Sequence, residues 1–301
     1  TFTFSEDVTG FTAEDITVTN GTKGEFSGSG KVYTLVVTNT ESTTQTVKVD
    51  EAVCTDTVGN SNIASDTYTI TVDRIAPTVT VTADKESPTN ANSITYTFTF
   101  SEDVKGFTAE DITVTNGTKG EFAGSGKVYT LVVTNTGSTT QKVIVAAGVC
   151  TDVAGNVNKV SNELSIVIDR TEPTVKITAD KESPTNASSI TYTFTFSEDV
   201  TGFTADDIIV TNGTKGAFSG SGKVYTLVVT NSGSTTQTVK VDANVCTDTI
   251  GNGNAASETF TMVIDRTAPT VKITADKSSP TNADSIKYTF TFSEDVKGFA
   301  D

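Results

Sequence analysis

The sequence contains no histidine and no tryptophan, and it has one methionine and three cysteines in 301 residues. Without histidine, the Ser-His-Asp triads, the histidine metal sites and the commonest general base are excluded. The glycine-rich stretches contain neither GxxxxGK[ST] nor GxGxxG, so these phosphate-binding loops are excluded as well. Catalysis by a pair of carboxylates, as in glycosidases, needs no histidine. Here, however, the carboxylate pairs recur in every copy of a repeat, and no tryptophan is present to bind a sugar ring. We therefore expect a protein that is not an enzyme.

Basic residues are scarce too. The chain has 21 Lys and Arg against 37 Asp and Glu, a net charge of −16 and a pI near 4.4. Nucleic acids and anionic membranes are bound through clusters of Lys and Arg, so neither is an expected partner. No apolar run is long enough to span a bilayer, and the first residues are not a signal peptide. We expect any export signal or anchor to lie outside this segment. The acidic composition fits either a soluble extracellular protein or one that collects divalent cations.

The main signal is an internal repeat. The octapeptide Thr-Phe-Thr-Phe-Ser-Glu-Asp-Val begins at Thr1, Thr97, Thr193 and Thr289, which gives a period of 96 residues. That period is too long for a solenoid unit of about 20–50 residues and is the size of a small domain. Residues 1–74 should lack the first strand and half of the second, and residues 267–301 should hold only the first two strands. The expected domains are therefore a partial repeat at 1–74, complete repeats at 75–170 and 171–266, and a partial repeat at 267–301.

The 96-residue period also predicts that the cysteines do not form disulfides. Cys54, Cys150 and Cys246 occupy the same position in three copies, so each repeat has one. Copies in successive domains would lie too far apart for a disulfide, which needs Cα atoms about 6 Å apart. We expect three free thiols, each a small buried residue; a redox or intermolecular role is the alternative.

Strands are best seen in the second repeat. From Ile94 to Phe100 apolar residues alternate with threonine, which is typical of a strand with one buried face. Asn116-Gly117 predicts a type I′ hairpin turn, because both central residues of that turn need a positive φ. Phe107–Asp111 suits a loop or a single helical turn. The other expected strands are Pro77–Ala83, Ile112–Val114, a segment around Phe122, Lys127–Val133, Val143–Val145 and Leu164–Ile168.

Seven short strands without helical periodicity predict an all-β fold of tandem immunoglobulin-like β-sandwich domains. The Cys–Trp–Cys core of antibody domains is absent, so burial has to come from Phe, Tyr, Ile, Val and Leu, which about 100 residues can supply. The second strand should bury Ile94, Tyr96, Phe98 and Phe100.

Five motifs in a fixed order add a resemblance that covers the whole chain. They begin at Tyr96 (YTFTFSEDV), Gly106 (GFTAEDI), Tyr129 (YTLVV), Thr151 (TDVAGN) and Ile168 (IDRTEPTV). Together they resemble the bacterial Ig-like repeats of large surface and biofilm adhesins. The resemblance implies an extracellular stalk on the cell surface, often stiffened by Ca²⁺ at domain junctions. Two residues depart from that pattern: Arg170 where many such repeats have threonine, and Cys150 in place of an alanine.

Acidic loops are expected to meet where one domain joins the next. Alternating strand directions place the loops at 101–111 and 150–162 at the end of the sandwich that the linker reaches. Their carboxylates and amides supply the oxygen ligands that Ca²⁺ prefers. Local roles are the alternative: Asp111 capping a turn, Asp152 forming an Asx-turn, Asp73 pairing with Lys or Arg. The candidate ligands are Asp73, Glu102, Asp103, Asp111, Asp152 and Asn156 at one junction, and Asp169, Glu198, Asp199, Asp207, Asp248 and Asn252 at the next.

Three functions remain open. The first is a structural extender of an adhesin or biofilm fibre, whose partners are adjacent repeats of the same or identical chains. The second is the subunit of a filament assembled head to tail, in which residues 267–301 of one chain complete residues 1–74 of another by strand donation. The third is a module that binds glycans or proteins. Near-identical copies favour the extender, because a binding head would differ from its neighbours.

Overall fold

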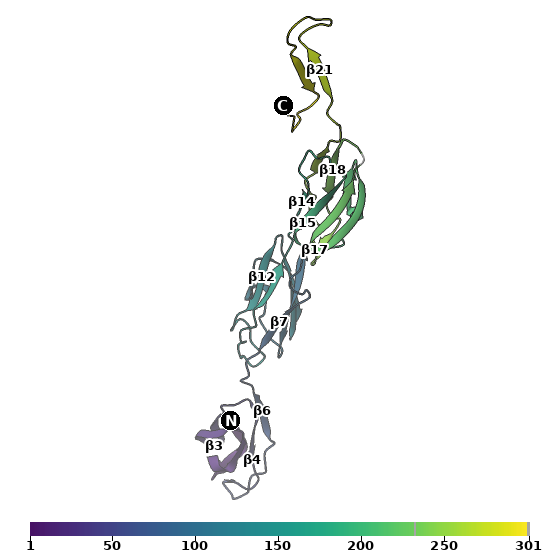
Figure 1. The fold of residues 1–301 in the computed structure, drawn as a ribbon. Helices are drawn as coiled ribbons and strands as arrows, with labels where there is room; N and C mark the ends of the chain where they lie inside the picture. The colour runs from purple at the N-terminus through teal and green to yellow at the C-terminus, as the bar shows by residue number, and fades with distance from the viewer. Residues whose placement is uncertain (232, 300–301) are drawn as a thin grey trace. The chain divides into compact units, whose positions relative to one another are not determined.

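The computed structural model describes residues 1–231 and 233–299, which form strands, loops and three single 3₁₀ turns. The chain divides into two compact units, Thr1–Asp169 and Arg170–Asp301. Figure 1 draws their strands as arrows and labels several of them. Within the described residues, none of the helical segments has the length and apolar character needed to cross a bilayer.

The second repeat has the seven predicted strands. Their pairing gives a four-stranded sheet in the order β10-β11-β8-β7 and a three-stranded sheet in the order β13-β12-β9, with every pair antiparallel. This order is that of the constant-type immunoglobulin sandwich, which confirms the predicted fold class. The elements are β7 (Val79–Ala83), β8 (Ser93–Phe100), η2 (Ala109–Asp111), β9 (Ile112–Thr115), β10 (Thr118–Ser125), β11 (Val128–Thr134), β12 (Thr139–Val145) and β13 (Leu164–Ile168).

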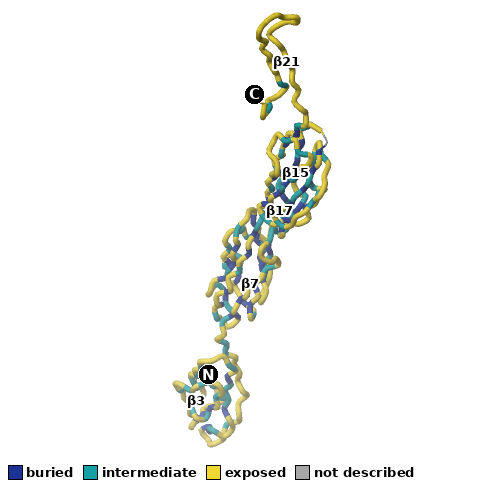
Figure 2. The backbone as a smooth tube through the Cα atoms, in the orientation of Figure 1, coloured by how far each residue is buried: buried dark blue, intermediate teal, exposed yellow. Residues whose placement is uncertain are grey.

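The alternating pattern of β8 explains the core. Ile94, Tyr96 and Phe98 are 0% exposed and Phe100 is 2% exposed, which confirms the predicted register. Strands β11 and β12 contribute Leu131 and further valines to the same cluster. Buried residues appear as dark blue stretches of the backbone tube in Figure 2. Each fully buried side chain of this size contributes about 1.5–3 kcal/mol, so the sandwich needs no disulfide.

The predicted hairpin at Asn116-Gly117 is wrong. Strands β9 and β10 flank this turn but belong to different sheets, so the chain crosses between sheets here. Asn116 does have a positive φ of 58°, whereas Gly117 is not in the positive-φ region. Glycine is needed at 117 for space, because a Cβ there would collide with the side chains of Gln141 and Val133.

A buried hydrogen bond joins the two sheets. The Tyr96 hydroxyl on β8 donates to Oε1 of Gln141 on β12 at 2.7 Å. The Gln141 Nε2 donates in turn to the Asn116 backbone oxygen at 3.3 Å. In the third repeat, Tyr192 donates to Gln237 at 2.6 Å. Burial, with a smaller contribution from Asp84, raises the pKa of Tyr96 to about 12.

The three cysteines are free and buried, as predicted. The thiols of Cys54 and Cys246 contact Asn62 Oδ1 and Asn254 Oδ1 at 3.5 and 3.4 Å. Burial raises the pKa of Cys150 and of Cys246 to about 11, with a smaller contribution from a nearby aspartate in each case. A low fraction of thiolate makes these residues unreactive packing groups.

The other repeats use the same plan. In the third repeat the sheets are β14-β15-β17, with β19 also on β15, and β16-β18-β20; in the first they are β3-β1-β5 and β2-β4-β6. The third repeat consists of β14 (Val175–Ala179), β15 (Ser189–Thr201), η3 (Ala205–Asp207), β16 (Ile208–Thr211), β17 (Thr214–Thr230), β18 (Thr235–Val241), β19 (Thr247–Asp248) and β20 (Phe260–Ile264). The first repeat consists of β1 (Phe2–Thr9), η1 (Ala13–Asp15), β2 (Ile16–Thr19), β3 (Thr22–Thr38), β4 (Thr43–Val49), β5 (Thr55–Asp56) and β6 (Tyr68–Val72). The last strands, β21 (Val271–Ala275) and β22 (Tyr288–Phe292), form a two-stranded sheet.

Candidate metal site

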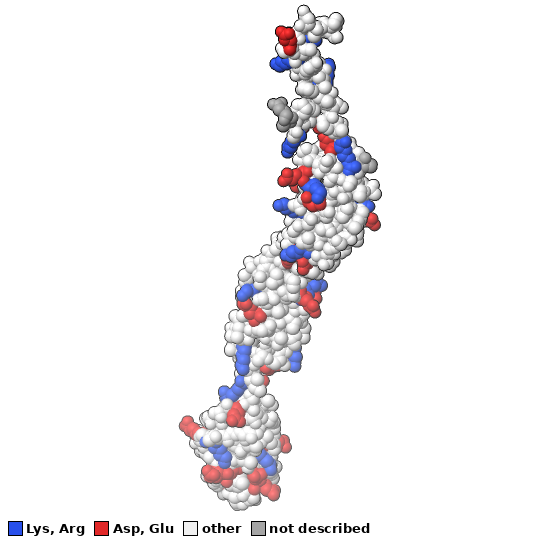
Figure 3. All heavy atoms as spheres, viewed as in Figure 1, with Lys and Arg blue, Asp and Glu red and all other residues white. Residues whose placement is uncertain are grey.

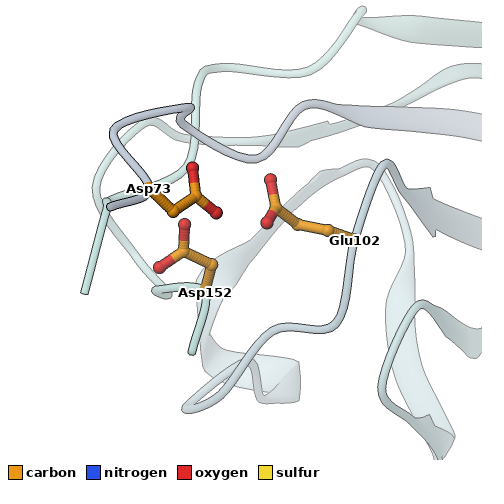
Figure 4. A group of neighbouring side chains, drawn as sticks. All are labelled: Asp73, Glu102 and Asp152. Carbon is orange, nitrogen blue, oxygen red and sulfur yellow. The ribbon is translucent and has the colours of Figure 1, made fainter. Parts of the chain in front are cut away.

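Three of the predicted ligands of the first junction come together. Asp73 lies in the linker after β6, Glu102 follows β8, and Asp152 lies in the loop after β12. One carboxylate oxygen of each residue lies within 4.8 Å of those of the other two. Figure 4 shows the three side chains pointing toward one another. We call these three residues the acidic cluster; all of them belong to the first unit.

Asp152 is the anchored member of the cluster. Its Oδ1 accepts hydrogen bonds from the backbone N–H groups of Gly155 and Asn156 at 2.6 and 2.8 Å, and its Oδ2 accepts one from Asn156 Nδ2 at 2.8 Å. Burial opposes ionisation of this carboxyl, but these hydrogen bonds outweigh it and lower the pKa of Asp152. The Asx-turn reading of Asp152 is thus correct, and the charged side chain still faces the other two acids.

The linker residue is held from two sides. Asn156 Nδ2 also donates to the backbone oxygen of Asp73 at 3.1 Å, and Asp73 Oδ1 accepts from the N–H of Ile75 at 2.9 Å. The neighbouring Arg74 donates to the backbone and side-chain oxygens of Asn39 at 2.9 and 3.2 Å. One asparagine therefore links the loop of the second repeat to the linker.

Within the acidic cluster, Glu102 is the residue whose pKa is raised. Partial burial raises the pKa of Glu102, and the negative charges of Asp152 and Asp73 raise it further, with Lys127 opposing them weakly. Three carboxylates this close repel one another, and their repulsion falls when a cation lies between them.

The remaining acids of this junction lie elsewhere. Asp111 Oδ2 accepts from the Thr108 backbone N–H and hydroxyl at 2.7 and 2.9 Å, which is the capping role weighed above. Asp103 packs on Gly126 at the β10–β11 turn, where a Cβ on the glycine would come within 3.0 Å of Asp103 Oδ1. Asp103 is adjacent to Glu102 in sequence but lies against this turn and is not part of the cluster.

Comparison of the sequence with models of known protein families identifies its family. Residues 1–72, 73–168 and 169–264 each match the family model of the bacterial Ig-like domain. The chain belongs to the bacterial Ig-like domain family. The search of curated proteins finds no match to it.

Several solved structures are similar to this chain at low identity. Invasin, titled a bacterial integrin-binding protein, is 13% identical with a TM-score of 0.35 over 91% of this chain and 55% of its own. InvD of Yersinia pseudotuberculosis is 13% identical with a TM-score of 0.30 over 70% and 66%. The I9-I11 tandem of titin is 11% identical with a TM-score of 0.25 over 88% of each chain. This chain thus spans little more than half of the invasin structure.

The loop in which an aspartate and the asparagine four residues later bond to each other, here Asp152 and Asn156, is called the Asp–Asn loop, and it recurs in the third repeat. Within the second unit, Asp248 Oδ1 accepts from the N–H groups of Gly251 and Asn252 at 2.7 and 2.8 Å, and Asn252 Nδ2 donates to its Oδ2 at 2.8 Å. Asp207 caps a turn with Thr204, as Asp111 does with Thr108, and Asp199 packs on Gly222, as Asp103 does on Gly126. Glu198 lies on β15 of the second unit, and Asp169 is the last residue of the first unit.

The sequence reasoning missed one copy of this loop. In the first repeat, Asp56 Oδ1 accepts from the N–H of Asn60 at 2.8 Å, and Asn60 Nδ2 donates to Asp56 Oδ2 at 2.8 Å. These bonds, above all the one from the Asn60 side chain, lower the pKa of Asp56. The 96-residue period carries the signal, because Asp56 and Asn60 lie one period before Asp152 and Asn156.

The ligand chemistry of the acidic cluster suits a hard divalent cation. Its three side chains offer only oxygen, and Ca²⁺ takes six to eight oxygen ligands, including carboxylates, carbonyls and waters. Softer metals prefer the imidazole and thiolate ligands that this cluster lacks. The residues present therefore fit Ca²⁺, which Asp73, Glu102 and Asp152 would hold.

Proposed function

We propose that this chain is an extracellular extender: a structural stalk segment of a bacterial cell-surface adhesin or biofilm fibre. The observation that carries the proposal is the repetition of one bacterial Ig-like domain with the same details each time. The free cysteine and the Asp–Asn loop recur in three copies, and the bond between sheets recurs in both complete ones. Repeating one domain adds length without adding a new binding site.

The surface is consistent with this role. On the face drawn in Figure 3, acidic and basic side chains are dispersed singly and in small groups, with uncharged surface between them. The net charge of −16 gives chains at the same cell surface a mutual repulsion that limits aggregation. Neither nucleic acid nor an anionic membrane is part of the proposal, because both are bound through concentrated positive charge.

If the chain is an extender, each added repeat should lengthen it by the same amount. Duplicating residues 171–266 within the chain should add one constant increment to the maximum dimension in small-angle scattering, and a second duplication should add the same again. A glycan array and a panel of host-surface proteins should show no binding by the chain. Binding that maps to a single copy would contradict the extender and favour the third function, a ligand-binding module.

We further propose that Ca²⁺ binds the acidic cluster and fixes the linker to the second repeat. Asp73 belongs to the linker, whereas Glu102 and Asp152 belong to the loops of the following repeat. Without a cation the three charges repel, so the linker should be loosely held; with Ca²⁺ the same oxygens become ligands.

Glu102→Gln tests this proposal, because its effect on amide exchange should be opposite in EDTA and in Ca²⁺. The substitution removes one of three repelling charges, so in EDTA it should slow amide exchange around residues 73–76. In Ca²⁺ it removes a ligand, so the protection that Ca²⁺ gives the unchanged chain should be lost. At a concentration 100 times the dissociation constant that protection corresponds to about 2.7 kcal/mol. Glu110→Gln is the matched control, because Glu110 is an exposed acid of the same repeat outside the cluster. Exchange at 73–76 that ignores both Ca²⁺ and EDTA would overturn the metal site.

A further inference from the structure

Strand β7 lies at the edge of its sheet in the second repeat, and one side chain covers the middle of that edge. Asn162 Oδ1 accepts a hydrogen bond from the Val81 N–H at 2.9 Å, and Asn162 Nδ2 donates to the Val81 backbone oxygen at 3.0 Å. Both backbone groups of Val81 therefore face away from β8, because a residue of an antiparallel strand directs its N–H and C=O to the same side. The asparagine occupies the place where a further strand would pair.

Strand β14 lies at the corresponding edge of the third repeat. It pairs Ile177 with Phe194 in the register in which β7 pairs Val81 with Phe98. The N–H and C=O of Ile177 therefore also face away from the sheet. Within residues 1–231 and 233–299, none of the hydrogen bonds reaches these two groups.

The residue that would cover them is different in this repeat. Position 258, one period after Asn162, is a glutamate. The loop before it keeps the same backbone bonds: the Ala255 N–H donates to the Pro173 oxygen at 2.9 Å, as the Lys159 N–H donates to the Pro77 oxygen at 2.8 Å. A carboxylate accepts hydrogen bonds but cannot donate one when ionised, so Glu258 cannot satisfy both an N–H and a C=O. The edge of β14 is thus open to pairing.

The outer face of β14 is complementary to a second copy of itself. Lys176, Thr178 and Asp180, the last directly after the strand, are exposed and share this face because side chains alternate along a strand. When two such strands run antiparallel about a two-fold axis through Thr178, Lys176 of each lies opposite Asp180 of the other. Opposite charges and threonine pairs directly across two antiparallel strands stabilise them, whereas like charges destabilise them.

The same register satisfies the backbone. Ile177 of each strand lies opposite Ala179 of the other, and both residues direct their N–H and C=O toward the partner strand. Ile177 is only 9% exposed, and its side chain stays on the core side of the sheet, so pairing does not disturb the core. Charge, side-chain face and backbone direction therefore favour one register.

We propose that β14 of the third repeat pairs with β14 of a second copy of the same chain, which joins two β14-β15-β17 sheets into one. Each chain uses the same surface, so the pairing is isologous and closes at a dimer. The second repeat does not take part, because Asn162 covers Val81 and Thr80 stands at the position of Lys176. This lateral pairing goes beyond the extender role and does not depend on it.

Exchanging the two charges tests the register in the 301-residue chain. All chains carry Ile273→Pro, because residues 271–276 repeat the sequence of 175–180 and proline removes the outward N–H needed for pairing there. Analytical ultracentrifugation should show a monomer of 31.5 kDa in equilibrium with a dimer of twice that mass.

Lys176→Asp alone and Asp180→Lys alone should each be monomeric, because like charges then face each other across the axis. An equimolar mixture of the two variants should give a heterodimer, because the acid introduced at 176 meets the lysine introduced at 180. Asp180→Lys also loses the bond that Asp180 Oδ1 accepts from the Thr191 N–H at 2.8 Å, so pairing in the mixture is the control for its folding.

Glu258→Asn tests the open edge without changing β14. It gives the third repeat the asparagine that covers β7 in the second, so the dimer should be lost. Glu258→Ala is the matched control: it removes the same charge without covering Ile177, so the dimer should remain.

Three results would overturn the proposal: a chain that is monomeric at every concentration, a mixture of the charge variants that does not pair, or a Glu258→Asn chain that dimerises like the unchanged one. In the first case Lys176 would act as a charge that keeps the edge strand unpaired. None of these results bears on the length that each repeat adds, so the extender and the lateral pairing can fail separately.

Discussion

Replacing Tyr96 with phenylalanine removes a single hydroxyl group from the centre of the second repeat. Tyr96 is fully buried and its ring packs with the core of both sheets. Phenylalanine fills the same space, so no cavity forms. The change leaves Gln141 Oε1 without the donor that lies 2.7 Å from it.

The expected cost follows from that orphaned oxygen. A buried acceptor left unsatisfied costs about 1–3 kcal/mol, whereas replacing both partners by apolar groups of similar shape is close to neutral. Tyr96→Phe should therefore destabilise the second repeat by about 1–3 kcal/mol. Adding Gln141→Met should recover only part of this, because the bond from Gln141 Nε2 to Asn116 is lost as well.

Amide hydrogen exchange of the whole chain can read one repeat at a time. Peptides from residues 139–149 differ in sequence from the equivalent 235–245, so the third repeat is an internal control. The expected cost corresponds to exchange about 5- to 150-fold faster in the second repeat and unchanged in the third. Equal acceleration in both repeats would show that their cores are not independent, and no acceleration in either would show that the hydroxyl is not a stabilising group.

Two further predictions concern the same cores. Raising the pH from about 9 to 12 should destabilise the second and third repeats, because Cys and Tyr ionise near 9.0 and 10.0 when unfolded but near 11 and 12 when folded. This stability is complete below pH 9 and is lost as the pH rises; a urea midpoint that stays constant over this range would contradict it. Gly117→Ala should destabilise the second repeat by about 1–3 kcal/mol in thermal unfolding, because its Cβ meets Gln141 and Val133. Gly137→Ala, which meets nothing within 4 Å, should leave that unfolding unchanged.

The sequence predicts where the candidate site lies, but it does not show which of the acidic residues there belong to it. The loops were placed at one end of the sandwich from strand directions alone, and Asp73, Glu102 and Asp152 do meet there. Asp111 could not be separated from them, since whether a carboxylate caps its own turn depends on local geometry. The structure shows that Asp111 caps its own turn, because its carboxylate accepts two hydrogen bonds from Thr108.

Sequence patterns alone predict the strands, the buried face of β8 and the unbridged cysteines. All of these follow from periodicity: a side-chain period of two along a strand and a period of 96 along the chain. Only the folded structure shows that β9 and β10, on either side of Asn116-Gly117, join different sheets, and that Gln141 meets Tyr96, 45 residues away. Such contacts join residues that no local pattern relates, because they arise only when two sheets pack face to face.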